Sequence, residues 1–211
     1  MGLNPYVAYR EPGFGFVATL TPPMTPFINL ADATDAHWEA VRQYKAQHPR
    51  DPAAPVLALL KSLDGCSSEG LPIDPYQHSL QTASRILRDG GDDESVVVGL
   101  LHDVGDFIAE KNHGELAATI LRPYVSEASV WLMEHHAAFQ GFYFWHQFGM
   151  DRHTRERWRG HPHYERTARF CHDYDQCSFD PSYDTLPIDA FEPALRRVLS
   201  RAPRHGDEVV L

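Results

Sequence analysis

Apolar residues recur along this chain at helical spacing, and no stretch of useful length alternates between apolar and polar residues. Between positions 35 and 48, Trp38, Val41 and Tyr44 follow one another at steps of three residues, which places them on one face of a helix. Further segments with a helical pattern are 56–63, 76–88, 94–102, 114–121, 127–139, 164–175 and 191–200. The pattern predicts an all-α protein, with a single helical domain over 36–211.

Residues that favour turns and caps separate these helical segments. Gly90-Gly91 ends the segment 76–88, and Asp92-Asp93 can cap the next helix. Residues 1–35 instead are rich in Pro, Gly, Phe and Thr. Because this stretch contains many aromatic side chains, we expect an extended arm that packs on the domain rather than a disordered tail.

Length and charge limit the classes of function. A chain of 211 residues fits one domain, and its formal net charge of -10 argues against nucleic acid or anionic membrane as the main partner. There is no apolar run long enough to span a membrane and no visible secretory signal, and the 3 cysteines suggest a reducing compartment. We therefore expect a cytoplasmic protein.

His102 and Asp103 end the most apolar of the predicted helices. An unpaired imidazole or carboxylate is costly to bury, whereas both are good ligands for metal ions. Four more candidate ligands lie at helix ends or on helices that can turn back toward this pair: His78, His113, His136 and Asp175. Helical bundles build metal sites in this way, from side chains on facing helices.

The candidate ligands are enough for two ions that share the carboxylate of Asp103. His78, His102 and Asp175 could complete the first site, and the remaining two histidines could complete the second. Imidazoles and carboxylates in this number suit iron, manganese, cobalt or zinc rather than calcium or magnesium. His135 is an alternative to His136, although the register of the following aromatic run favours His136.

The pattern H…HD…H…H…D formed by these residues resembles the HD-domain superfamily of metal-dependent enzymes over about residues 70–185. Within it, the stretch from His78 to Ala83, with 24 residues from His78 to His102, resembles the phosphonate-cleaving oxygenases. Residues 136–146 are similar to a His-aromatic-Trp-His stretch of myo-inositol oxygenase, and 174–178 resembles the last ligand segment of both. The resemblance implies two iron ions, Fe(II)/Fe(III), with substrate on one and O2 on the other.

The chain departs from these oxygenases at positions that contact their substrates. Asp106 stands where they carry His or Lys, Gln140 where the phosphonate enzymes carry Lys, and His172 where those carry Arg. Phosphonate needs charge-assisted donors, so these differences argue against a phosphonate substrate. Asp106 favours a cationic or polyhydroxy substrate, or alternatively hydrogen-bonds a ligating imidazole.

Three further polar residues have possible supporting roles. Lys111 could reach an anionic group of the substrate, with an exposed loop lysine as the alternative. Gln81, one turn after His78, could hold a metal-ligating side chain in position or lie at the surface. Glu69 lies near, but out of register with, the Glu that closes the iron site in the phosphonate enzymes.

The sequence thus predicts a dinuclear non-haem iron oxygenase that uses O2 to oxidise or cleave a small polar organic substrate. Asp103 and Asp106 are the expected catalytic carboxylates. The alternative is a metal-dependent phosphohydrolase that acts on a phosphoester or nucleotide with Mn, Co or Zn. A domain that only binds ligands is disfavoured, because all the ligand positions are filled.

Overall fold

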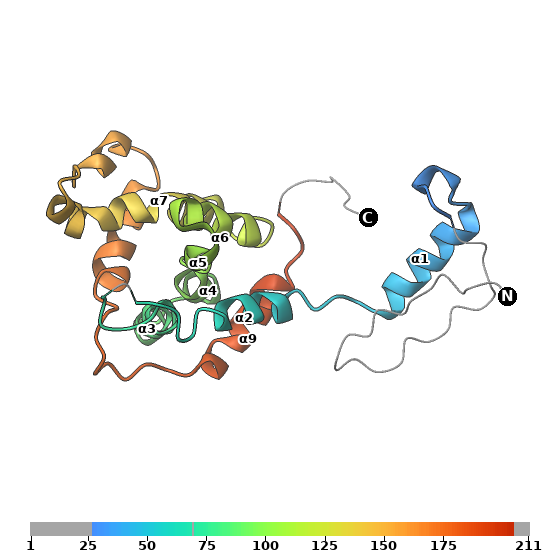
Figure 1. Cartoon of the computed structure of the whole chain (residues 1–211), viewed down its shortest axis with the longest axis horizontal. Coiled ribbons are helices and arrows are strands. Elements are labelled where there is room, and N and C mark those ends of the chain that lie inside the picture. Colours follow the sequence, from blue (N-terminus) through green and yellow to red (C-terminus); the bar gives the residue numbers. More distant parts are fainter. Residues whose placement is uncertain (1–26, 69, 205–211) are drawn as a thin grey trace. The chain divides into compact units, whose positions relative to one another are not determined.

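The computed structural model describes residues 27–68 and 70–204, and every regular element in these ranges is helical (Figure 1). This confirms the prediction of an all-α protein. The chain divides into two compact units, Met1–Arg50 and Asp51–Leu211. Residues 36–50, which the sequence pattern assigned to the domain, belong to the first unit. Most of the predicted N-terminal arm lies outside the described residues.

The described part of the first unit consists of a 3-10 turn, Leu30–Asp32, and helix α1, Asp35–Gln47. Thr34 caps α1 through a reciprocal arrangement with His37, whose Nδ1 lies 2.9 Å from the Thr34 backbone nitrogen. Phe27 packs edge-on against the His37 ring at a centroid distance of 5.0 Å. These contacts fix the start of α1 where the sequence predicts it.

The second unit contains the remaining helices. In chain order they are α2 (Ala53–Lys61), α3 (Pro75–Arg88), α4 (Asp93–Leu101), α5 (Asp106–Ala109), α6 (His113–Leu121), α7 (Glu127–Phe144), α8 (Tyr164–Phe170) and α9 (Glu192–Leu199). Short 3-10 turns lie at Glu110–Asn112, Trp145–Phe148, Thr154–Trp158 and Ile188–Ala190, and a π-helical turn at Cys171–Asp175. Helix α3 packs on α4, α6 on α7, and α7 on α8, while α4 also contacts α9.

Three helix boundaries differ from the sequence prediction by three residues or more. Helix α2 begins at Ala53 rather than at 56, because Pro55 lies in its first turn, where a missing N–H breaks no helical bond. Helix α7 continues to Phe144, five residues beyond the predicted end at 139. The predicted helix 164–175 changes at Cys171 into the π-helical turn that carries Asp175.

Helix α4 is the centre of the second unit, and its residues from Val96 to Leu101 are all buried. Two glycines permit the close helix packing around it. A Cβ on Gly99 would collide with the side chain of Ile86 on α3, and a Cβ on Gly114 would collide with the Met133 carbonyl on α7. The helices that carry the candidate histidines can therefore approach closely.

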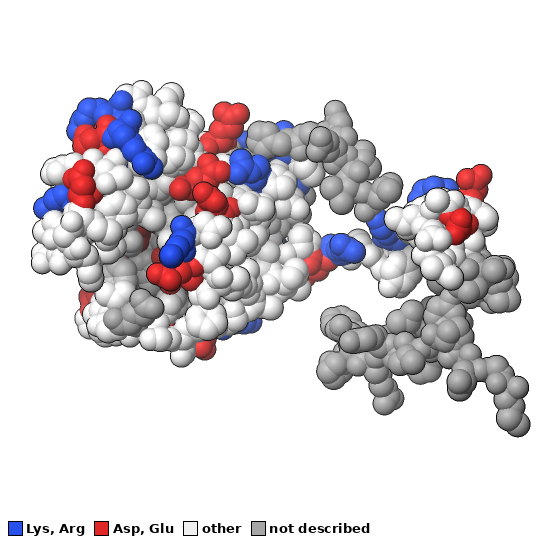
Figure 2. All heavy atoms as spheres, turned by 45° about the horizontal axis from the view of Figure 1, so that its top comes forward, with Lys and Arg blue, Asp and Glu red and all other residues white. Residues whose placement is uncertain are grey.

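Acidic and basic side chains are interspersed on the face of the larger unit that Figure 2 shows. Several of them pair, as Arg122 does with Glu134 at 2.6 Å. Within the described ranges, no helix is both long and apolar enough to cross a membrane.

Candidate metal centre

The first cluster of candidate ligands lies where α3, the end of α4 and the π-helical turn meet. The Nε2 atom of His78 is 3.2 Å from His102 Nε2 and 3.2 Å from Asp175 Oδ1. Asp103 Oδ2 lies 3.3 Å from His78 Nε2 and 3.2 Å from His102 Nε2. His78, His102 and Asp175 are buried. Donor atoms from four residues thus converge on one small volume in the interior.

The second cluster lies on the other side of the same carboxylate. His113 is the first residue of α6, and its Nε2 lies 3.1 Å from Nε2 of His136 on α7. Asp103 Oδ1 is 3.3 Å from the first of these nitrogens and 2.9 Å from the second. Each oxygen of Asp103 therefore faces a different histidine pair, which is the geometry of a bridging carboxylate.

Backbone carbonyls fix the orientation of all the candidate histidines. The Nδ1 atoms of His78, His102, His113 and His136 lie 2.9, 2.9, 2.8 and 2.7 Å from the carbonyl oxygens of Ser178, Gly99, Glu110 and Met133, respectively. A carbonyl can only accept, so each Nδ1 carries the proton, and in the neutral ring Nε2 keeps its lone pair. Two facing lone pairs at 3.1–3.2 Å repel unless a cation lies between them.

The carboxylates of the first cluster also favour a cation nearby. Asp175 Oδ1 accepts a hydrogen bond from Gln140 Nε2 at 2.5 Å, but its buried Oδ2 has no hydrogen-bond partner among the described residues. A buried carboxylate oxygen without a partner is costly, and a metal ion removes that cost. Imidazole nitrogens together with carboxylate oxygens fit iron, manganese, cobalt or zinc.

The electrostatics of the first cluster agree with this reading. Burial opposes a charge on His78, but hydrogen bonds and charges from Asp103 and Asp175 outweigh burial and raise its pKa to about 9. Burial likewise opposes a charge on His102, yet the same carboxylates raise its pKa well above the ordinary value. Burial would raise the pKa of Asp103, but the neighbouring imidazoles hold it well below its usual range. The carboxylates therefore favour positive charge between them, from protons or from metal ions.

The structure separates the two histidines that the sequence left as alternatives. His136 is 1% exposed and faces Asp103. His135 instead stacks on Trp131 at a centroid distance of 4.2 Å, with Nδ1 2.9 Å from the Trp131 carbonyl. Burial lowers the pKa of His135. The geometry favours His136 as the ligand.

The residues predicted to contact substrate lie at different distances from the centre. Gln140 faces the candidate ligand Asp175 directly, as described above. Asp106 begins α5, and its Oδ1 lies 3.8 Å from Nδ1 of His113, too far for a hydrogen bond. His172 is exposed and pairs with the Tyr143 hydroxyl at 3.1 Å. Lys111 is exposed in the 3-10 turn before α6.

Gln81 and Glu69 were expected to hold the metal ligands in position without binding the metal themselves. Gln81 is buried, and its amide exchanges hydrogen bonds with the backbone of Asp180 at 2.9 and 3.1 Å. It thereby fixes the loop whose Ser178 carbonyl accepts from His78. Glu69 lies outside the described residues.

Two aromatic rings that the sequence reasoning missed cover the first cluster. Phe179 stacks on the His78 ring at 4.4 Å, and Phe170 meets the His102 ring edge-on at 5.4 Å. The signal available in the sequence was their position just before and just after the candidate ligand Asp175. Asp103 and His113 are partly exposed, at 17% and 16% of their side-chain surface.

No protein-family model matches this chain, and no curated protein matches it either. The fold and the site define a helical protein with two groups of His and Asp side chains whose geometry could hold a metal ion.

Proposed function

We propose that this chain holds two iron ions and uses O2 to oxidise or cleave a small polar organic substrate. The observation that carries the proposal is the position of Asp103, with Oδ2 facing one histidine pair and Oδ1 facing the other. Two iron ions at these positions would supply electrons for O2 and free coordination positions for an oxygen atom of the substrate.

The unequal exposure of the two clusters supports a direction of approach for the substrate. The first cluster is buried beneath Phe170 and Phe179, whose rings exclude water from it. The second cluster has the more exposed His113. The substrate therefore approaches from the side of His113.

Asp106 lies on the side of the proposed approach. Its side chain is 43% exposed, and Oδ1 lies 3.8 Å from the His113 ring. A carboxylate accepts hydrogen bonds from hydroxyl and ammonium groups and repels phosphate. This position supports a polyhydroxy or cationic substrate, for which Asp106 Oδ1 would be the proton acceptor.

The alternative is hydrolysis of a phosphoester, and one residue favours it. Arg155 is only 14% exposed, and its Nε lies 3.8 Å from Glu156 Oε1 without a hydrogen bond among the described residues. Burial raises the pKa of Tyr143, against the opposing effect of Arg155, so the guanidinium lies near that phenol. Phosphate recognition requires such charge-assisted donors, and Mn, Co or Zn at the centre would activate water.

Metal analysis combined with O2 consumption tests the proposal. Protein loaded anaerobically with Fe(II) should contain two irons per chain and give an S = 1/2 EPR signal after one-electron oxidation. O2 uptake should then depend on one member of a panel of polyols, amino alcohols and phosphonates. A protein that retains Mn or Zn, consumes no O2 with the panel and hydrolyses p-nitrophenyl phosphate would establish the alternative instead.

Neighbouring histidines on α7 offer a matched pair of variants. His136→Ala removes a proposed ligand and should leave one iron of the two. His135→Ala removes a ring of the same kind that faces Trp131 and should leave both irons. Equal iron contents in the two variants would contradict the assignment of ligands.

A further inference from the structure

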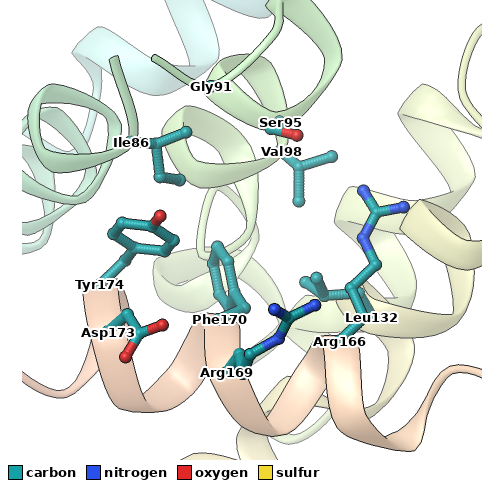
Figure 3. A pocket seen from close by; sticks show the side chains of 10 residues that line it. All are labelled: Ile86, Gly91, Ser95, Val98, Leu132, Arg166, Arg169, Phe170, Asp173 and Tyr174. Atoms are coloured by element: carbon teal, nitrogen blue, oxygen red, sulfur yellow. The ribbon is translucent and has the colours of Figure 1, made fainter. Parts of the chain in front are cut away.

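A pocket of about 250 Å³ lies among α3, α4, α7 and α8 (Figure 3). Its apolar wall is formed by Ile86, Val98, Leu132 and Phe170. None of the candidate metal ligands lines it. The pocket is therefore a separate feature of the helical unit.

Two arginines of α8 form the polar side of this pocket. Arg166 and Arg169 are one helical turn apart, and Figure 3 shows their side chains extending beside Leu132. Arg166 Nη2 donates to Ser129 Oγ at 2.9 Å. Ser129 Oγ in turn donates to Glu94 Oε1 at 2.8 Å, so Arg166 is linked to that carboxylate through the hydroxyl. Arg169 is exposed, and Asp173 lines the same pocket.

The two arginines exceed the one carboxylate, Asp173, among the side chains that line this pocket. Like charges one turn apart repel, and an anion between them relieves that repulsion. A planar guanidinium binds carboxylate or phosphate through two parallel hydrogen bonds. The apolar wall, in turn, favours a ligand with a hydrophobic body.

The pocket is also adjacent to the candidate metal centre along the same helices. Val98 precedes His102 by one turn of α4, and Leu132 precedes His136 by one turn of α7. Phe170 lines the pocket and touches the His102 ring, with centroids 5.4 Å apart.

We propose that this pocket binds a small anion with an apolar body, such as an aryl or alkyl carboxylate or phosphate monoester. The anionic group lies between Arg166 and Arg169, and the apolar body lies on Val98 and Phe170. The proposal does not depend on which metal the centre holds.

Calorimetric titration of the metal-loaded protein with benzoate and with phenyl phosphate tests this site. Both should bind saturably, at one molecule per chain. Arg169→Ala should weaken binding about tenfold or more, as expected for the loss of a charge-assisted hydrogen bond. Ser95→Leu should abolish binding, because Ser95 lines the pocket and a larger side chain fills it.

Lys61→Ala is the matched control, because it removes one positive charge at the exposed end of α2 and should leave binding unchanged. Carboxylates can also bind metal ions directly. Binding that survives both Arg169→Ala and Ser95→Leu would therefore overturn the proposal, as would the absence of saturable binding. Inorganic phosphate should bind more weakly than phenyl phosphate, and equal affinities would contradict the role of the apolar wall.

Discussion

Carboxylates are buried in two regions of the second unit, and the two regions differ in the hydrogen-bond donors that surround these carboxylates. Glu94 lies at the start of α4, where Oε1 accepts from Ser126 N, Ser126 Oγ and Ser129 Oγ at 2.8, 2.6 and 2.8 Å. Its Oε2 accepts from Arg201 at 2.8 Å. Both of its oxygens are satisfied by donors of the chain itself.

The other end of α4 leads to Asp103 and the facing Asp175, and Gln140 Nε2 donates to Asp175 Oδ1 at 2.5 Å. Their other neighbours are imidazole nitrogens, which in the neutral ring have lone pairs, and Asp175 Oδ2 has no hydrogen-bond partner among the described residues. A buried carboxylate with a full set of donors stabilises the fold, whereas one surrounded by lone pairs favours an added cation. The carboxylate at the start of α4 thus has hydrogen-bond donors for both oxygens, whereas the carboxylates beyond its end favour a bound cation.

Asp103→Ala should have the largest effect, because it removes the one carboxylate that both clusters share. The affinity for both ions should fall by more than the 10–100-fold that loss of a ligand's hydrogen-bond partner costs. Plasma mass spectrometry of the purified variant measures the loss. Asp106→Ala is the control, and it should keep both ions because Asp106 lies beyond hydrogen-bond distance of the His113 ring.

Glu94→Gln should leave metal binding intact but destabilise the fold. The substitution removes the charge that accepts from Ser126 and Arg201, so the free energy of unfolding should fall by about 2–3 kcal/mol in urea titrations. Glu127→Gln, at an exposed position of α7, should change it little. If Glu94→Gln lost metal ions and kept its stability, the proposed difference between the Glu94 cluster and the metal centre would be wrong.

The stability that Glu94 contributes should depend on pH. Burial would raise its pKa, but hydrogen bonds from Ser126, Ser129 and Arg201 outweigh burial and lower it from 4.5 to about 2. A lowered pKa means that the contribution is complete above about pH 4.5 and is lost as the pH falls toward 2. The stability difference between the wild type and Glu94→Gln should therefore be constant at neutral pH and shrink in acid. A difference that grows in acid would contradict this account.

Gln140→Ala should have a smaller and more local effect. It removes the hydrogen bond to Asp175 Oδ1, so the first ion should bind about 10–100-fold more weakly while the second is unchanged. Competition with a chelator separates the two affinities. Gln147→Ala, which removes an exposed glutamine just after α7, should alter neither. Equal weakening of both ions would indicate that Gln140 acts on the whole centre.

The helical class and the convergence of the candidate ligands could be predicted from the sequence. Helical periodicity fixes which residues share a face, and the His102-Asp103 pair at the end of a buried helix is a strong local signal. The contact of Gln140 with Asp175 could not be predicted, because the pattern appeared to end the helix at 139. Its continuation to Phe144 places Gln140 one turn after His136.

The Glu94 cluster could not be predicted either. Its partners Ser126 and Arg201 are 32 and 107 residues away along the chain, and no periodic pattern relates such positions. Gln81 and Asp180 are paired over a similar separation of 99 residues. Contacts of this kind depend on the packing of whole helices rather than on local sequence.

The number of metal ions per chain tests whether Asp103 joins two ion sites. The iron-loaded wild type should contain two ions, while His78→Ala and His113→Ala should each contain one. One ion in the wild type, or two in both variants, would contradict this role of Asp103.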